Sequence, residues 1–171
     1  MEKQIHLLNE LLETFLFISK VQNSFIKIDL RNVPISNVLH EIIVEIQNIY
    51  KEKHISLSLQ IKENLSIFSD EKLLHLILKN LIDNSFKYTN AKGKIEIVLE
   101  KDSFSITDNG IWIHKDKLEN IFETFYRESD DEKWYGVWLN IVKKSVEILG
   151  YTLQVQSTKW FGSTFFISFN K

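Results

Sequence analysis

Cysteine is absent from the sequence, and proline and glycine are scarce, with one proline and five glycines. The lack of cysteine excludes disulfide bonds and thiolate metal sites. No apolar run approaches the roughly 20 residues that cross a bilayer as a helix. The formal net charge is −2 and the basic residues do not cluster, so the chain lacks the electrostatic signature of a nucleic-acid-binding protein.

What is present indicates a globular protein. The 171 residues are 44% hydrophobic and 26% charged, which suits one domain of about 100–150 residues with a short appendage. The first residues, MEKQIHLLNELLETF, are amphipathic and partly acidic, unlike a signal peptide. We therefore expect a cytoplasmic chain, and an anchor in the inner membrane, if the full-length protein has one, would lie upstream.

The N-terminal segment predicts an amphipathic helix over residues 4–22. Ile5, Leu8, Leu12 and Phe15 recur at three- and four-residue steps, which gives a wide apolar stripe. Such a stripe suits packing against a second helix. The alternative is a helix that folds back onto its own domain.

The central part of the chain alternates between the periodicities of helices and strands. Ser36 follows Pro34 and is the expected N-cap of one helix, and Ser69 or Asp70 is the expected N-cap of a longer one. The expected elements are a strand at 26–30, a helix at 36–52, a strand at 55–61, a helix at 70–88 and a hairpin of strands 94–99 and 104–107.

The C-terminal third continues this order. The expected elements are a short helix at 115–126, a mobile loop at 128–136, a helix at 139–149 that Gly150 ends, and two strands at 151–156 and 163–169. The fold class that follows is α+β. We expect a two-layer sandwich in which three helices cover one face of a mixed sheet, preceded by the N-terminal helix.

The helix at 70–88 carries a polar stripe near its end. Asn80, Asn84 and Lys87 lie at positions i, i+4 and i+7 and therefore share one side of an otherwise apolar helix. Amide oxygens suit Mg²⁺, and a nearby lysine suits phosphate oxygens. The alternative is a solvated face on which the two asparagines have no ligand.

Five sequence runs resemble, in order, the motifs of the ATP-binding catalytic domain of sensor histidine kinases. They are the N box NLIDNSFKYT (80–89), the first glycine box DNGIWI (108–113), the F box IFETFYR (121–127), the second glycine box with its helix GVWLNIVKKSVEILG (136–150), and the closing strand FGSTFFISF (161–169). The resemblance covers roughly residues 28–170. It implies the Bergerat fold, which the gyrase, chaperone, histidine kinase and MutL superfamily shares.

The resemblance implies a Mg²⁺-ATP site with assigned roles. Asn84 would hold Mg²⁺ with Asn80 beside it, and Lys87 would approach the phosphates. Asp108 would accept a hydrogen bond from the adenine amino group, and Tyr88 would lie against the base.

Further matched positions would surround the same nucleotide. Phe122 and Phe125 would anchor a lid over ATP, although packing in the core explains them equally well. Arg127 would reach the phosphates, so that the implied catalytic residues are Asn80, Lys87 and Arg127. The other positions implied to contact ATP are Gly110, which would pass close to the base, Ile113, the N–H groups from Gly136 through Val137 and Trp138 to Leu139, Ser163 and Thr164.

All four tryptophans stand where the family usually has glycine: Trp112, Trp134, Trp138 and Trp160. Tryptophan adopts a positive φ only at a cost, and its bulk fills space meant for nucleotide. One explanation is a degenerate kinase whose pocket the indoles fill. The other is that the four codons are UGA, which some bacterial lineages read as glycine. With tryptophan at these positions we expect little or no ATP binding.

The histidine that such a kinase phosphorylates has no counterpart here. Residues 1–24 resemble the C-terminal part of a dimerisation helix, and residues 25–171 resemble the catalytic domain. The family places the phosphoacceptor in an H-E-x-x-T-P-like box, whereas His40 and Glu41 are not followed by Thr-Pro. We therefore expect a fragment that does not phosphorylate itself.

The resemblance implies the ATP-binding part of a two-component sensor histidine kinase. It would transfer the γ-phosphate of ATP to a histidine on a dimerisation helix, with Mg²⁺ as cofactor. The implied partners are the dimerisation helices of the same kinase, in a homodimer when full-length, and the receiver domain of a response regulator. One alternative is a pseudokinase that serves as a protein-interaction module. A gyrase-like ATPase is disfavoured because Asn80 stands where that group has its general base.

Overall fold

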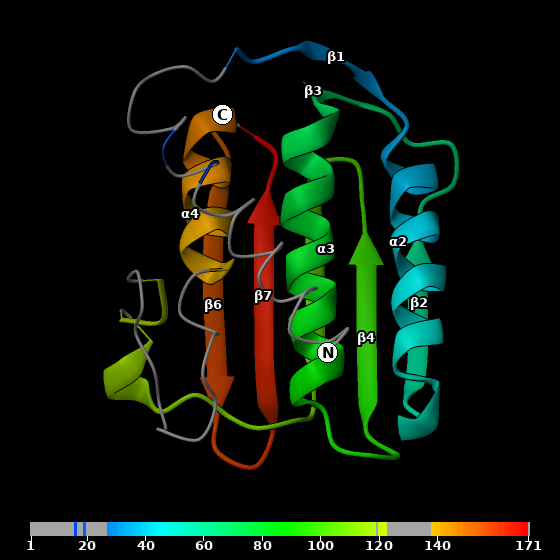
Figure 1. Ribbon diagram of the computed structural model, residues 1–171, viewed down its shortest axis with the longest axis vertical. Coiled ribbons are helices and arrows are strands. Elements are labelled where there is room, and N and C mark those ends of the chain that lie inside the picture. Colours follow the sequence, from blue (N-terminus) through cyan, green and yellow to red (C-terminus); the bar gives the residue numbers. More distant parts are fainter. Residues whose placement is uncertain (1–15, 17–18, 20–26, 119, 123–137, 171) are drawn as a thin grey trace.

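The structure is a computed structural model that describes residues 16, 19, 27–118, 120–122 and 138–170. Three helices lie on one face of a five-stranded sheet (Figure 1). The elements in chain order are β1 (Leu30–Val33), α2 (Ile35–Ile49), β2 (Ser56–Ile61), β3 (Ile67–Asp70), α3 (Glu71–Tyr88), β4 (Lys94–Leu99), β5 (Ser103–Asp108), α4 (Trp138–Leu149), β6 (Thr152–Thr158) and β7 (Gly162–Ser168).

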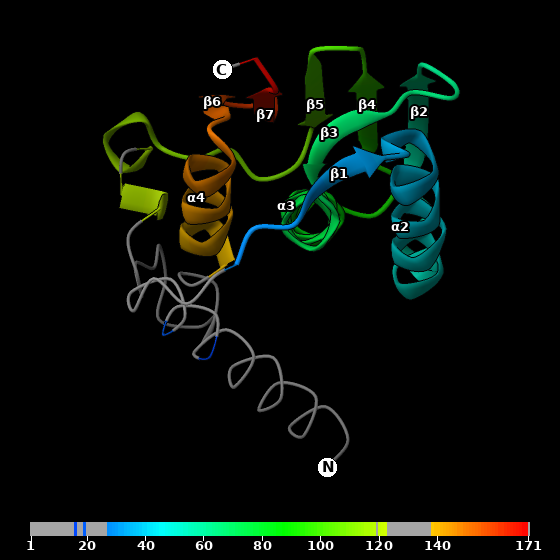
Figure 2. The same cartoon turned by 90° about the horizontal axis from the view of Figure 1, so that it is seen from above.

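The main sheet has the strand order β2-β4-β5-β7-β6. β2 pairs parallel with β4, and the other three pairs are antiparallel, so the sheet is mixed. Figure 2 shows α2, α3 and α4 together on one side of it. The predicted α+β class, with a mixed sheet covered on one face by helices, is therefore confirmed.

The core lies between α3 and the central strands. β4 and β5 alternate between buried and more exposed residues, as half-buried strands do. Ile97, Phe104 and Ile106 point under the helices and are fully buried, as are Leu78 and Leu81 of α3. The opposite face of the sheet carries mainly serine, threonine and glutamine.

Several local predictions need correction. The first strand begins at Leu30 rather than at residue 26, and the short strand β3, which pairs with β1, was not expected. Ser36 is not an N-cap: it lies inside α2, where its Oγ donates to the carbonyl of Lys62 at 2.8 Å. Four-residue strands produce too little alternation to stand out in a sequence.

Asp70 is the N-cap of α3, as one of the two expected alternatives. Its Oδ1 accepts the N–H of Leu73 at 3.0 Å, and its Oδ2 accepts the N–H of Asp29 at 2.8 Å. The carboxylate thus pairs with one of the free N–H groups of the first turn. It also binds the backbone of Asp29, directly before β1. Gly150 follows α4 with φ +72°, the left-handed conformation expected after a helix.

The segment after β5 contains two 3₁₀ turns, Lys115–Lys117 and Asn120–Phe122, rather than the single helix expected at 115–126. The expected loop at 128–136 lies outside the described residues, as does nearly all of the N-terminal helix predicted at 4–22. Within the described parts of the chain, each helix is too short or too polar to traverse a bilayer.

Candidate functional site

The end of α3 presents the polar stripe that the sequence predicts. Asn80, Asn84, Lys87 and Tyr88 are each half-buried. Asn80 donates from Nδ2 to the carbonyl oxygen of Leu76 at 2.7 Å, which leaves its Oδ1 as the atom that could accept from or coordinate a ligand. The Nζ of Lys87 lies 5.8 Å from the centre of the Tyr88 ring.

Asp108 ends β5 and is almost completely buried, with 4% of its surface exposed. Its Oδ1 accepts the N–H of Gly110 at 2.9 Å. Burial raises the pKa of the Asp108 carboxyl to about 6, although the backbone N–H groups of Gly110 and Ser163 and the nearby Ser85 hydroxyl act to lower it. Burial of a carboxyl costs free energy, and a carboxyl with a pKa raised by burial is a candidate ligand-binding group.

The backbone after Asp108 runs directly against the end of α3. The N–H of Ile111 donates to the carbonyl of Tyr88 at 3.1 Å. A Cβ at Gly110 would lie 2.9 Å from the Cα of Thr89, so no larger residue fits without displacement. The structure therefore brings Asp108 and the polar end of α3 together. The close neighbour of Gly110 is this helix end, whereas the resemblance implied the adenine base.

Two buried hydroxyls near this junction, those of Ser85 and Thr89, have no hydrogen-bond partner in the described part of the chain. The Oγ1 of Thr89 is inaccessible to solvent and makes no hydrogen bond in the described part of the chain. An unpaired buried hydroxyl costs free energy of folding. Thr89 was not singled out by the sequence, because a threonine after a helix is an ordinary feature.

Ser157, which the sequence did not single out, joins the glycine-box segment to the last two strands. Its Oγ accepts the N–H of Ile113 at 2.8 Å and donates to the carbonyl of Gly162 at 2.9 Å. The Oγ atoms of Ser157 and Ser163 are 3.0 Å apart. Ile113 and Ser163 therefore lie together beside Asp108, and Ser157 links them.

Thr164 lies away from this group. Its Oγ1 is 3.0 Å from the Oγ1 of Thr107, its partner on β5. Thr107 alternates with the buried Ile106 and Asp108, which places both threonines on the face of the sheet that the helices leave open.

The lid residues that the structure describes lie against α4. Phe122 is half-buried against the core, its carbonyl accepts Nδ2 of Asn140 at 2.7 Å, and its ring lies 5.8 Å from the Nζ of Lys143. Asn140 is a further residue that the sequence did not single out. Trp138 and Leu139 form the first turn of α4 and are half-buried. The remaining predicted site residues lie outside the described residues: Phe125, Arg127, Gly136 and Val137.

The end of α3 lies near one end of the sheet. In Figure 1, α3 runs down to its last residue near the lower ends of the strands, whereas α4 begins higher. α3 packs against α4. The arrangement sets amide oxygens, a lysine and a buried carboxyl around the end of α3.

Comparison with known proteins identifies this arrangement. The family model described as "Histidine kinase-, DNA gyrase B-, and HSP90-like ATPase" matches residues 69–171, which is more than half of the chain. The chain belongs to this ATPase family. The match begins one residue before the cap of α3 and includes Asn80, Asn84 and Asp108, so the resemblance found in the sequence is confirmed.

The most similar relatives include sensor kinases. The adaptive-response sensory kinase SasA of Synechocystis sp. is 32% identical over 95% of this chain and 45% of its own length. The heme sensor protein HssS of Staphylococcus saprophyticus is 30% identical over 96% of this chain and 36% of its own length. The chain thus spans less than half of these curated relatives.

Solved structures have the same fold. The full-length ShkA structure in complex with AMPPNP aligns with a TM-score of 0.84 at 24% identity, over 98% of this chain and 36% of that one. The mycobacterial sensor histidine kinase MprB aligns with a TM-score of 0.71 at 20% identity, over 81% of this chain and 96% of that one.

Two tryptophans of this ATPase domain lie beside one lysine. Trp160 has φ +71° and is 80% exposed. The Nζ of Lys159 lies 5.0 Å from the Trp160 ring and 5.8 Å from the Trp112 ring, and the Trp112 ring lies 5.5 Å from that of His114. Trp112 and Trp138 do not have positive φ, so the expected backbone cost applies to Trp160 alone among the described tryptophans.

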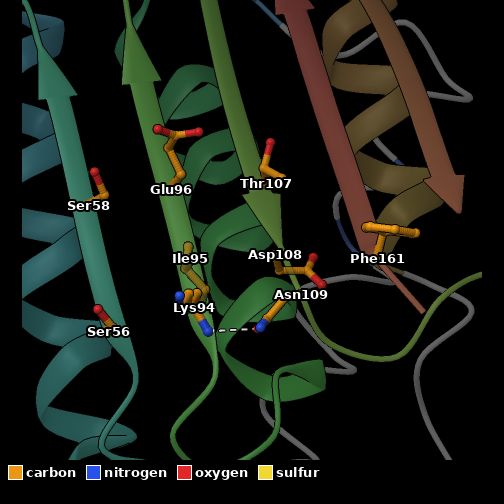
Figure 3. A pocket seen from close by; sticks show the side chains of 9 residues that line it. All are labelled: Ser56, Ser58, Lys94, Ile95, Glu96, Thr107, Asp108, Asn109 and Phe161. Atoms are coloured by element: carbon orange, nitrogen blue, oxygen red, sulfur yellow. Dashed lines mark hydrogen bonds between the residues drawn. The ribbon is translucent and has the colours of Figure 1, made fainter. Parts of the chain in front are cut away.

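A hollow of about 290 Å³ lies on the open face of the sheet, away from the helices (Figure 3). Its lining residues come from β2, β4, β5 and the ends of two turns: Ser56, Ser58, Lys94, Ile95, Glu96, Thr107, Asp108, Asn109 and Phe161. Only Asp108 belongs to the predicted ATP site, so this hollow is a separate feature of the ATPase domain.

Proposed function

We propose that the chain is the ATP-binding catalytic part of a two-component sensor histidine kinase. It binds Mg²⁺-ATP where the end of α3 meets the end of β5. The observation that carries the proposal is the buried Asp108 carboxyl, held against a helix end that bears two half-buried asparagines and a half-buried lysine.

Asp108 suits the recognition of adenine. A buried carboxylate oxygen accepts a hydrogen bond from an exocyclic amino group more strongly than a neutral acceptor does. The Thr89 hydroxyl lies beside Gly110 but is inaccessible to solvent, so Asp108 alone carries the proposed recognition of adenine.

The α3 stripe suits a magnesium triphosphate. Among the described residues no group of three or more histidines, acidic residues or cysteines could hold a metal ion. Asn84, with Asn80 beside it, offers amide oxygens, and Mg²⁺ held by few protein ligands takes the rest of its shell from water and phosphate. Lys87 would contact the phosphates as a mobile positive charge.

The second glycine box and the lid complete the proposed site. The N–H groups of Gly136, Val137, Trp138 and Leu139 at the start of α4 would bind phosphate oxygens. Phe122, Phe125 and Arg127 would belong to a lid that closes over ATP. Ile113 and Ser163 would lie beside the adenine base, and Ser157 would hold these two residues together. We keep Thr164 as a site residue only through its β7 backbone, because its side chain contacts Thr107.

The proposed reaction transfers the γ-phosphate to a histidine on a dimerisation helix. Such a transfer demands placement and charge neutralisation, and the imidazole is itself the nucleophile. Asn80 cannot activate a water molecule as a carboxylate would, which favours transfer over hydrolysis. The proposed partners are the dimerisation helices of the same kinase, in a homodimer when full-length, and a response regulator receiver domain.

A second candidate is a pseudokinase that serves as an interaction module. The bulky tryptophans at the glycine-box positions favour it, because Trp138 stands at the start of α4, where phosphate would bind. The conformation of Trp160 supports glycine at that position instead. The nucleotide sequence separates these possibilities, since UGG codons exclude a glycine translation.

Calorimetric titration with Mg²⁺-ATP tests the proposal. We expect binding by a chain with glycine at positions 112, 134, 138 and 160, and a loss of about tenfold or more in affinity for Asn84→Ala, provided Mg²⁺ is present. Asn48→Ala, on the exposed side of α2, is the matched control and should bind normally. Equal affinities of the two alanine variants would remove Asn84 from the site, and no binding by the glycine-bearing chain would reject the function.

A further inference from the structure

Lys53 binds the end of α3 with all three protons of its ammonium group. It is the last residue of the 3₁₀ turn Lys51–Lys53 between α2 and β2. Its Nζ donates to the carbonyl oxygens of Phe86 at 2.8 Å, Lys87 at 2.6 Å and Thr89 at 2.9 Å. An ammonium group has three N–H donors and no acceptor, so these three carbonyls use its full capacity.

The last carbonyls of a helix have no partner within the helix, and they carry the negative end of its dipole. Lys53 supplies both the missing donors and a positive charge at that end. The N–H of Thr89 completes the last turn by donating to Ser85 at 3.0 Å. The lysine therefore takes the place of the glycine-based cap that many helices use.

The surroundings hold the ammonium group in this position. The Nζ lies 5.3 Å from the Tyr50 ring, and Tyr50 donates its hydroxyl to Oδ1 of Asp83 at 3.1 Å. Burial lowers the pKa of Lys53, and the Asp83 carboxyl opposes this effect. The backbone carbonyl of Lys53 also accepts the N–H of Lys92 at 2.7 Å, so one residue ties both sides of the α3–β4 connection.

The turn that Lys53 binds is the one that carries the polar stripe. We propose that Lys53 is a positioning residue for the nucleotide site: its ammonium group fixes the last turn of α3 so that Asn84, Lys87 and Tyr88 are in place before ATP arrives. This inference rests on the proposed function. Lys53 does not touch the nucleotide, and its effect passes through the backbone of Lys87 and through Tyr88, whose carbonyl receives the N–H of Ile111.

Lys79 offers a matched control on the same helix. Its Nζ lies 2.7 Å from Oε1 of Glu45 and joins α3 to α2, but both side chains are about half exposed. Lys79→Met removes an ammonium group that contacts another segment from the side of α3, without affecting the end of α3. Lys53→Met keeps the aliphatic stem and removes the three donors. Lys53→Arg keeps the charge, although a planar guanidinium cannot direct three donors as an ammonium group does.

The test uses the full chain with glycine at the four tryptophan positions and two measurements. Amide hydrogen exchange without nucleotide should be at least about tenfold faster at Thr89 and Ile111 in Lys53→Met, with the β6–β7 hairpin unchanged. The affinity for Mg²⁺-ATP should fall about tenfold, and Lys53→Arg should lie between Lys53→Met and the parent chain. Lys79→Met should resemble the parent chain in both measurements.

The possible outcomes separate the two proposals. Exchange at Thr89 and Ile111 that is as slow in Lys53→Met as in Lys79→Met overturns the role of Lys53, and so does faster exchange with unchanged nucleotide affinity. If the parent chain fails to bind Mg²⁺-ATP, the proposed function is rejected, and with it the purpose assigned to Lys53. If Lys53→Met does not fold, the same comparison between Lys53→Arg and Lys79→Met decides.

Discussion

A Cβ atom at Gly110 would lie 2.3 Å from the carbonyl oxygen of Tyr88, far inside the contact distance of two such atoms. This spacing joins the two halves of the proposed site, because Gly110 follows Asp108 and Tyr88 ends the polar stripe of α3. Glycine is required here because of the limited space, since Gly110 does not have a positive φ. The obstacle is backbone, which cannot rotate away as a side chain can.

Gly110→Ala should therefore separate the end of β5 from the end of α3. We expect a loss of about 2–3 kcal/mol in the free energy of unfolding, typical of overpacking, together with weaker nucleotide binding. Urea unfolding and calorimetry measure the two effects. Ile111→Ala is the neighbouring control: its side chain is 57% exposed, and the hydrogen bond to Tyr88 comes from its backbone, so little change is expected. A Gly110→Ala protein as stable as Ile111→Ala would contradict the close approach.

The buried carboxyl of Asp108 should make stability depend on pH. Its pKa is about 6 in the folded protein against an ordinary value of 3.8, so between these values the folded state binds more protons than the unfolded state. The contribution of this group is then fully present below about pH 4 and is lost as the pH rises through 6. Its size is about 3 kcal/mol, since one pKa unit corresponds to roughly 1.4 kcal/mol.

Asp108→Asn removes this titration and allows the effect to be isolated. The free energy of unfolding of the parent chain relative to the variant should fall by up to about 3 kcal/mol between pH 4 and pH 8. Urea unfolding at several pH values measures it. Asp102→Asn, at the exposed turn between β4 and β5, is the control and should show no comparable change in that difference. A difference independent of pH for Asp108→Asn would mean that the carboxyl is not buried as described.

Much of this domain could be predicted because its long elements carry strong periodicity. The alternation in β4 and β5 and the apolar spacing of α3 exceed what chance gives, and Asp70 stands directly before the first helical residue. The polar stripe of α3 was visible because Asn80 and Asn84 interrupt an otherwise apolar helix. The prediction that this stripe and Asp108 form one site, however, came from the order of the family motifs and not from periodicity.

The features that escaped prediction depend on contacts between distant segments. Ser36 comes soon after a proline and was predicted as an N-cap, but its hydroxyl donates to the Lys62 carbonyl 26 positions later in the chain. Thr164 belongs to a matched motif, yet the alternation of β7 turns its side chain toward Thr107 on the open face. Lys53 was not singled out by the sequence, because nothing in its local sequence indicates that the end of α3 comes within reach.

Replacing Trp160 by glycine, the residue that the family usually has there, should stabilise the protein. Trp160 has φ +71°, a conformation that costs an L-residue with a side chain roughly 1 kcal/mol or more and costs glycine little. Its ring is 80% exposed, so little buried surface is lost with it beyond the contact with Lys159. We expect Trp160→Gly to raise the free energy of unfolding by about 0.5–1 kcal/mol, measured by urea unfolding.

Phe161→Gly provides the comparison for this change. Phe161 is the next residue, is 76% exposed and does not have a positive φ, so glycine there only adds freedom to the unfolded chain. We expect a loss of about 0.5–1 kcal/mol. If both glycine variants lose stability to the same extent, the backbone at position 160 does not favour glycine. The conformation of Trp160 then no longer supports the explanation that its codon encodes glycine.

Asp70 should contribute more to stability than its exposed neighbour Glu71. The buried Asp70 carboxylate accepts N–H groups from both Leu73 and Asp29, so Asp70→Ala leaves two donors without their partner. Loss of an N-cap costs about 1–2 kcal/mol, and the second unpaired N–H should bring the total to about 2–3 kcal/mol.

Glu71→Ala removes an ion pair with Arg31, whose Nη2 lies 2.6 Å from the Glu71 Oε2, but both side chains are about half exposed. Such pairs contribute less than about 1 kcal/mol. Because α3 begins at Asp70 and ends in the proposed site, Asp70→Ala should also speed amide hydrogen exchange at Leu73 while leaving Thr89 slow, since Lys53 holds the other end. Equal acceleration at both ends would show that α3 opens as one unit and that its two caps do not act independently.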